Sequence, residues 1–165
     1  MTELVIDTNV LLVAEEKHPD TSEECILACV ERLQGIMESP AMNVVVDDAY
    51  RILGEYQNKI DLNRDHGVGA VFLKWLINQW ARLVQISLTE NAPDHFTEFP
   101  VATLQPDFDA ADRKFPAVSN AHPNKPQILQ AVDCKWLRWG PERAAVCATG
   151  YCRCPANVCR FSTRN

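Results

Sequence analysis

The most constraining feature of this 165-residue chain is an apolar run at its start that contains one acid. Residues 4–6 (Leu-Val-Ile) are apolar throughout and followed by Asp7. A short run of this kind is typical of a central strand that helices cover on both faces, as in a parallel sheet. Asp7 would lie at the carboxyl end of that strand, where ligands of open parallel sheets bind. Asp7 therefore either caps a turn through Thr8 and Asn9 or belongs to a functional site.

Strand-like and helix-like patterns alternate along the rest of the chain. Apolar runs predict buried strands near residues 3–7, 42–46 and 128–133, and a short alternating pattern predicts another strand at residues 83–88. Apolar residues at three- and four-residue steps predict helices near residues 21–37, 49–60 and 68–83, and another that begins at residue 107. Residues 89–106, which contain three prolines, are interpreted as a surface loop. This order predicts an α/β fold, with a parallel sheet between helical layers.

Two polar patterns predict how the helices begin. Thr21 and Glu24 have the spacing of a capping box. Asp47 or Asp48 is expected to cap the helix that follows the second strand. His122 precedes the last predicted strand and is expected to be a hydrogen-bonded loop residue.

The net charge of −6 hides an asymmetry between the two ends of the chain. Residues 1–110 hold seven basic and 19 acidic residues, whereas residues 111–165 hold nine basic and three acidic ones. Acids around a cation beside a basic surface would suit a nucleic-acid substrate, but a solvated acidic surface with a basic tail is equally consistent. The chain contains neither an apolar run of about 20 residues nor a secretory leader, so we expect a cytoplasmic protein without membrane contact.

Four acids share a setting in the predicted fold. Asp7 and Asp133 end apolar strands, Asp112 lies in the first turn of the helix before the second of these strands, and Glu55 lies in the helix after the strand at residues 42–46. Parallel strands would bring these positions to one edge of the sheet, where carboxylates repel each other unless a cation joins them. Oxygen ligands suit Mg²⁺ or Mn²⁺ better than zinc, and one or two such ions can activate water against a phosphodiester.

Four motifs in this order resemble PIN-domain ribonucleases over residues 3–139: DTNVLL at 7–12, LGEY at 53–56, FDAADRKF at 108–115 and ILQAVD at 128–133. The resemblance implies a three-layer α/β/α fold with four or five parallel strands and metal-dependent endoribonuclease activity on RNA. It also implies the site residues: Asp7, Glu55, Asp112 and Asp133 as catalytic, metal-binding acids, Asn9 holding Asp7, and Asp109 as a supplementary acid. Many toxins of the family are neutralised by an antitoxin protein, although nothing in this chain identifies such a partner.

Several alternatives stay open in the sequence. A PIN-like module that binds RNA or protein without cleaving is the main alternative, and a nuclease acting on DNA is another. Arg113 and Lys114 lie beside the proposed site and are weak candidates for phosphate contacts. Whether the chain forms a homodimer is also open.

The last part of the chain differs in composition from the rest. Residues 1–139 are expected to form the PIN-like domain and residues 140–165 a Cys-rich basic tail, whose order or disorder stays open. Cys147, Cys152, Cys154 and Cys159 provide four thiols in 13 residues. Four thiolates can bind zinc, but neither half of the segment contains the CxxC pair of the usual zinc site. We therefore favour an incidental tail over a zinc site.

Overall fold

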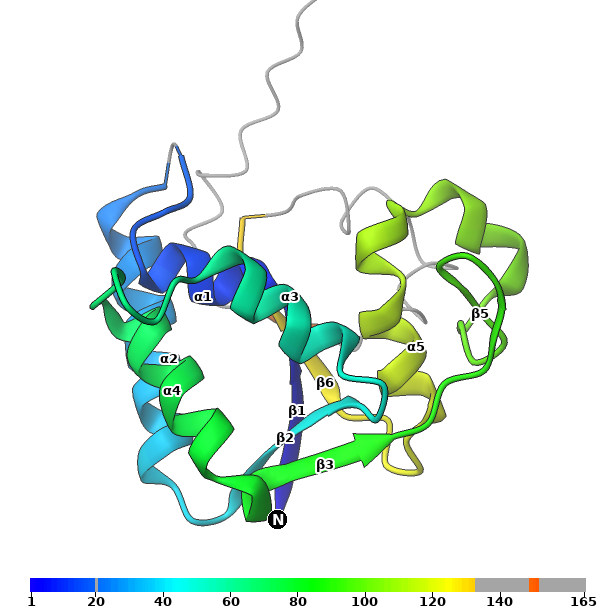
Figure 1. The fold of residues 1–165 in the computed structure, drawn as a ribbon, viewed down its shortest axis with the longest axis horizontal. Helices are drawn as coiled ribbons and strands as arrows, with labels where there is room; N and C mark the ends of the chain where they lie inside the picture. Colours follow the sequence, from blue (N-terminus) through cyan, green and yellow to red (C-terminus); the bar gives the residue numbers. More distant parts are fainter. Residues whose placement is uncertain (20, 133–148, 152–165) are drawn as a thin grey trace, which may run out of the picture.

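A central parallel sheet organises the chain, as Figure 1 shows for this computed structural model, which describes residues 1–19, 21–132 and 149–151. Its strands are β1 (Thr2–Ile6), β2 (Met42–Asp47), β3 (Leu83–Ile86), β6 (Gln127–Gln130) and β7 (Thr149–Tyr151), in the order β3-β2-β1-β6-β7. All four pairings are parallel, so the strands end at a common carboxyl edge. β1 lies in the middle, and its residues Val5 and Ile6 are fully buried. The prediction of a central buried strand is confirmed.

Helices lie on both sides of this sheet (Figure 1). They are α1 (Thr8–Ala14), α2 (Glu23–Glu38), α3 (Arg51–Lys59), α4 (Val68–Asn78) and α5 (Lys114–Ala121). α1, α2 and α4 pack against one another, whereas α5 packs on β1, β2 and β6. α1 and α3 lie near the carboxyl edge of the sheet in Figure 1. The predicted α/β class is confirmed. Within the part of the chain described, the helices are all too short or too polar to cross a bilayer.

Helix boundaries differ from the predictions in places that have local explanations. α1 was not predicted, because its seven residues are largely apolar and too few to show a helical period. The cap of α2 is Ser22 and not Thr21: its hydroxyl oxygen accepts the N–H of Cys25 at 3.3 Å. α5 begins only at Lys114, after short 3₁₀ turns at Ala102–Asp107 and Ala110–Asp112. Pro116 fits there because the first turn of a helix needs no backbone donor.

Residues 89–106 contain more structure than the predicted surface loop. Glu90–Ala92 (β4) and His95–Phe96 (β5) form an antiparallel hairpin. The side-chain amide of buried Gln105 accepts the N–H of Phe96 at 2.6 Å and donates to its carbonyl at 3.1 Å. Phe96 and Phe99 are buried beneath the hairpin. The segment is therefore a folded insertion beside the sheet, and the loop prediction is wrong here.

The cysteines of α2 and part of the predicted tail lie within the described residues. Cys25 and Cys29 are both fully buried, and Cys25 is disulfide-bonded. Residues 149–151 of the predicted tail pair with β6 as strand β7. The four cysteines of the possible zinc site lie outside the described residues.

Candidate functional site

Asp7 lies directly after β1 and is buried, with 2% of its surface exposed. Its carboxylate accepts the backbone N–H of Asn9 at 2.7 Å and caps α1. Its own N–H donates to the carbonyl of Leu129 at 2.8 Å, which ties the end of β1 to β6. The capping interpretation is confirmed, and Asn9 holds Asp7 through its backbone. These bonds fix the Asp7 carboxylate at the carboxyl edge of the sheet.

The Glu55 carboxylate is where three segments of the chain meet. From α1, the Thr8 hydroxyl donates to Oε1 of Glu55. From the start of α5, the Lys114 ammonium lies 2.5 Å from Oε2 and also donates to the carbonyl of Ala111. The exposed fractions of the two side chains are 8% for Lys114 and 20% for Glu55. Residues 8, 55 and 114 thus converge, and Thr8 directly follows Asp7 in the chain; the predicted gathering of Asp7, Glu55 and Asp112 into one metal-binding group is not found.

Hydrogen bonds to β2 and β1 hold α3, the helix that carries Glu55, in place. Asp47, fully buried at the end of β2, accepts the N–H groups of Arg51 at 2.9 Å and Ile52 at 2.8 Å. It therefore caps α3, as predicted for Asp47 or Asp48. Tyr56, beside Glu55, donates its hydroxyl to the carbonyl of Ile6 in β1. Burial, reinforced by the charges of Asp7, Glu55 and Asp47, raises the pKa of Tyr56 well above 10.0.

Tyr56 is a positioning residue that sequence reasoning missed. The pattern showed it as an apolar residue on the inner face of α3, and its ring is indeed fully buried. A buried tyrosine hydroxyl needs a hydrogen-bond partner, which was the signal available in the sequence. The partner, a main-chain carbonyl 50 residues away, could be identified only in the folded chain.

The other predicted acids have different positions. Asp112 ends the 3₁₀ turn Ala110–Asp112 and is half-buried, two residues before Lys114. Its segment reaches Glu55 through the Lys114 ammonium. Asp109 is exposed at the start of the same turn. Asp133 lies outside the described residues.

Arg113 is turned into the protein, with 8% of its surface exposed. Its guanidinium donates to the carbonyl of Phe108 at 3.1 Å and to that of Pro106 at 3.4 Å, and lies 3.1 Å from Nδ1 of His95. These bonds anchor the insertion to α5, so the predicted phosphate contact gains no support. His122 is hydrogen-bonded as predicted, since its Nδ1 accepts the N–H of Asn124 at 3.1 Å.

The donor atoms at this edge suit a hard divalent cation, but the described residues do not complete a ligand set. Carboxylate oxygens are the ligands that Mg²⁺ and Mn²⁺ prefer. Glu55 already binds one positive charge, the Lys114 ammonium. In the described part of the chain, however, no group of three or more His, Cys, Asp or Glu side chains could hold a metal ion. A full set would therefore need donors beyond these residues, and Asp133 is the predicted one.

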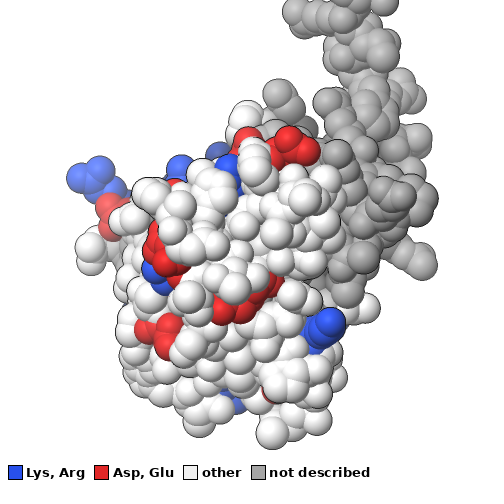
Figure 2. Space-filling model, turned by 90° about the vertical axis from the view of Figure 1, so that its right-hand side faces the viewer, with Lys and Arg blue, Asp and Glu red and all other residues white. Residues whose placement is uncertain are grey.

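The insertion beside the site is strongly acidic. Residues 83–112 contain six Asp or Glu residues and neither Lys nor Arg. Figure 2 views the side of the molecule that carries α5 and β5 and shows several acidic patches on this face, one of them in its middle, with basic atoms toward its margins. Arg51 of α3 reaches across to this segment and pairs with Glu90 at 2.6 Å. A polyanion would be repelled from this side of the site.

Comparison with known proteins adds no relative: no protein-family model, no curated protein and no solved structure matches the chain.

Proposed function

We propose that the carboxyl edge of β1 is the active site of a Mg²⁺- or Mn²⁺-dependent endoribonuclease with a PIN-like fold. The observation that supports this proposal best is the convergence of α1, α3 and the start of α5 on the Glu55 carboxylate, together with the burial of Asp7 at the end of β1. Elements distant in the chain thus place acids at the edge where parallel sheets bind their ligands. The resemblance of the four acidic motifs to PIN-domain ribonucleases adds the reaction and the RNA substrate.

Each residue of the site has a definite task in this proposal. The resemblance assigns Asp7, Glu55, Asp112 and Asp133 to a divalent cation, which would supply an activated water and neutralise charge on the phosphodiester; the first three do not by themselves form a metal-binding group in the structure. The Asn9 N–H and the Thr8 hydroxyl orient the carboxylates of Asp7 and Glu55. The Lys114 ammonium keeps Glu55 neutralised in the free protein and lies where it could attract a phosphate.

The direct test is cleavage of single-stranded RNA by the purified full chain with Mn²⁺. We expect cleavage by the parent, none in EDTA, and a loss on the order of 100-fold or more in Asp7→Asn and Glu55→Gln. Asp94→Asn is the matched control, because Asp94 is an exposed acid of the insertion. Its backbone is in the left-handed region, a conformation that asparagine also tolerates. Equal cleavage by Asp7→Asn and the parent would reject the assignment. A parallel digestion of DNA separates an RNase from a DNase.

A catalytically inactive PIN-like module that binds RNA or protein is the second candidate. Two observations favour it: Lys114 already neutralises Glu55, and the described residues contain no three-residue metal group. Binding of RNA without turnover in any divalent cation would support this function. A role as the toxin of a toxin–antitoxin pair belongs to the first candidate, and growth arrest that depends on Asp7 would be its signature on expression in a host cell.

A further inference from the structure

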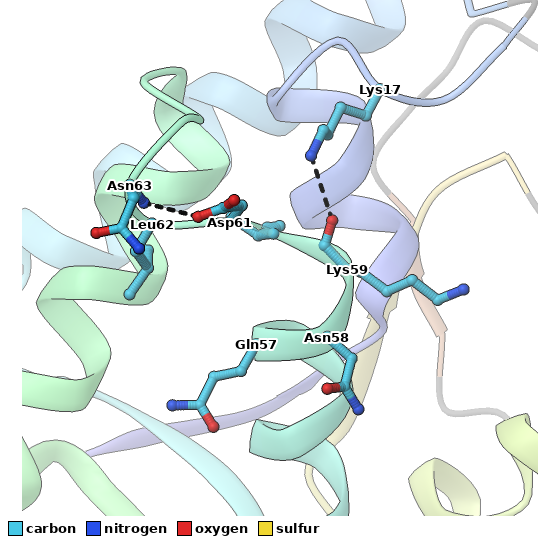
Figure 3. A pocket seen from close by; sticks show the side chains of 8 residues that line it. Lys17, Gln57, Asn58, Lys59, Asp61, Leu62 and Asn63 are labelled. Carbon is cyan, nitrogen blue, oxygen red and sulfur yellow. Dashed lines mark hydrogen bonds between the residues drawn. The ribbon is translucent and has the colours of Figure 1, made fainter.

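A hollow of about 580 Å³ lies at the end of α3, one helical turn beyond the acidic edge (Figure 3). Its lining comes from α3, from the turn that follows and from Lys17 after α1: Lys17, Gln57, Asn58, Lys59, Ile60, Asp61, Leu62 and Asn63. Figure 3 shows Gln57 and Asn58 leaving α3 and Lys17 reaching the carbonyl of Lys59. The hollow is thus built at the C-terminal ends of α1 and α3, the two helices that carry Thr8 and Glu55 of the proposed site.

Most polar groups around the hollow have no partner within the described part of the chain. The side-chain amides of Gln57, Asn58 and Asn63 are exposed and make no hydrogen bond there, and the Lys59 ammonium forms no ion pair. Lys17 is different, because it pairs with Asp65. Free amides next to a free ammonium can bind a ligand that offers donors, acceptors and negative charge together.

The hollow and the proposed site share one helix. Asn58 and Lys59 follow Glu55 by three and four residues, so they lie on the same face of α3, about 5 Å further along its axis. Leu62, which is 37% exposed, adds an apolar surface to the lining. A nucleic-acid strand that lies along α3 from Glu55 would therefore reach the hollow within one or two nucleotides.

The charges around α3 favour a nucleic-acid strand that runs toward the hollow over one that runs toward the insertion. On the opposite side the insertion at residues 89–106 holds three acids and no basic residue, and Glu90 among them pairs with Arg51. Around the hollow, Asp61 and Asp65 are paired with Arg64 and Lys17, which leaves Lys59 as a surplus positive charge. A phosphate backbone is attracted to Lys59 and repelled by the insertion.

We propose that this hollow is a recognition subsite for an unpaired base of a single-stranded RNA substrate, close to the bond that the proposed nuclease cleaves. The proposal rests on the function proposed above. Amide side chains carry both donor and acceptor groups and can read the Watson–Crick edge of a splayed-out base. Asn58 reads the base, Leu62 contacts its face, and Lys59 binds the neighbouring phosphate without reading sequence.

Binding is measured separately from cleavage. Fluorescence anisotropy with the four labelled RNA homopolymers is recorded on the full chain in the Asp7→Asn background. We expect Asn58→Ala to level the affinities among the homopolymers, and Lys59→Ala to weaken all of them about 5- to 10-fold and to lower the salt slope by about one. The matched controls are Asn91→Ala in β4 and Lys74→Ala in α4, both exposed, and melting temperatures verify that every variant is folded.

The outcomes separate the two proposals. Changed binding in the hollow variants without cleavage by the Asp7-containing parent would keep the subsite and reject the nuclease. Unchanged affinity and base preference in Asn58→Ala and Lys59→Ala, with Mn²⁺-dependent cleavage by the parent, would reject the subsite alone. Absence of RNA binding by the parent would also overturn the subsite. If the hollow instead binds a protein partner, the hollow variants would bind RNA as the parent does.

Discussion

Glu55 and Lys114 form an ion pair in which both partners are largely withdrawn from water, at 2.5 Å. Lys114→Met keeps the length and apolar stem of the side chain but leaves the Glu55 carboxylate without its cation. We expect a loss of about 2–3 kcal/mol in the free energy of unfolding, because an uncompensated, mostly buried charge is costly. Urea denaturation measures the change. The double variant Lys114→Met/Glu55→Gln should recover part of the loss, and a double variant as unstable as the single one would contradict the ion-pair explanation.

At the same scale, Gly69 decides how closely α1 and α4 approach. A Cβ atom at this position would lie 2.3 Å from the backbone oxygen of Leu11. We expect Gly69→Ala to destabilise the fold by about 1–3 kcal/mol, since the clash outweighs the helix propensity that alanine gains. Gly35→Ala in α2 is the control: it meets no atom within 4 Å and should stabilise by about 0.5–1 kcal/mol. A neutral or stabilising Gly69→Ala in thermal denaturation would show that the two helices can separate freely.

At the scale of elements, α4 depends on a cap supplied from another helix. The Glu15 carboxylate, just after α1, accepts the N–H of Gly67 at 2.7 Å and that of Ala70 at 2.7 Å. We expect Glu15→Ala to lower the stability by about 1–2 kcal/mol, because two amides at the start of α4 lose their acceptor. Glu15→Gln, which keeps one amide oxygen, should lose less. Hydrogen exchange at residues 67–70 should speed up selectively in Glu15→Ala, and unchanged exchange there would contradict the capping role.

At the scale of the whole molecule, pH should limit stability at both extremes. The N–H of Asp94 and the Arg51 guanidinium lower the pKa of Glu90 below 4.5, and the Lys17 ammonium lowers the pKa of Asp65 below 3.8. Their stabilisation is present above these ordinary values and lost as the pH falls through the lowered ones. Tyr56 behaves oppositely: its raised pKa gives stability that is complete below pH 10.0 and lost at higher pH.

Urea midpoints measured across the pH range test this behaviour. We expect a plateau between about pH 5 and pH 9, with declines on both sides. Tyr56→Phe should be less stable by about 1 kcal/mol at neutral pH, because it loses the bond to Ile6, and should flatten the alkaline decline. If the urea midpoint of Tyr56→Phe declines at high pH as much as that of the parent, groups other than Tyr56 cause the decline.

Local pattern was enough to predict the sheet and most of the helices. Residues 4–6 and 44–46 are apolar runs without a helical period, and both proved to be buried strands of the parallel sheet. The same reasoning predicted that Asp7 and Glu55 lie near one edge, because the positions of strand ends follow from the order of elements. α1 and the hairpin of β4 and β5 escaped it, since a seven-residue apolar helix and a two-residue strand carry too little periodicity.

The site was less predictable than the fold. Arg113 was predicted to be a surface cation beside the acids, but its guanidinium donates hydrogen bonds to the carbonyls of Phe108 and Pro106. Lys114, its neighbour, is the one that reaches Glu55. Both side chains are buried, and their adjacent positions in the sequence give no sign of which one reaches the acid, because packing sets the direction of each side chain where a 3₁₀ turn leads into a helix.

Taken alone, the order of residues determined four strands of the central sheet, that these strands run parallel, and that Asp7 follows the first of them, because apolar periodicity and chain connectivity are local properties. Only the tertiary structure decided which groups touch: that Lys114 neutralises Glu55, that Asp47 and Tyr56 hold α3, and that Glu15 caps α4. These bonds join residues brought into contact by packing, and hydrogen bonds and ion pairs act only over a few ångströms, so their partners become defined when the chain has folded.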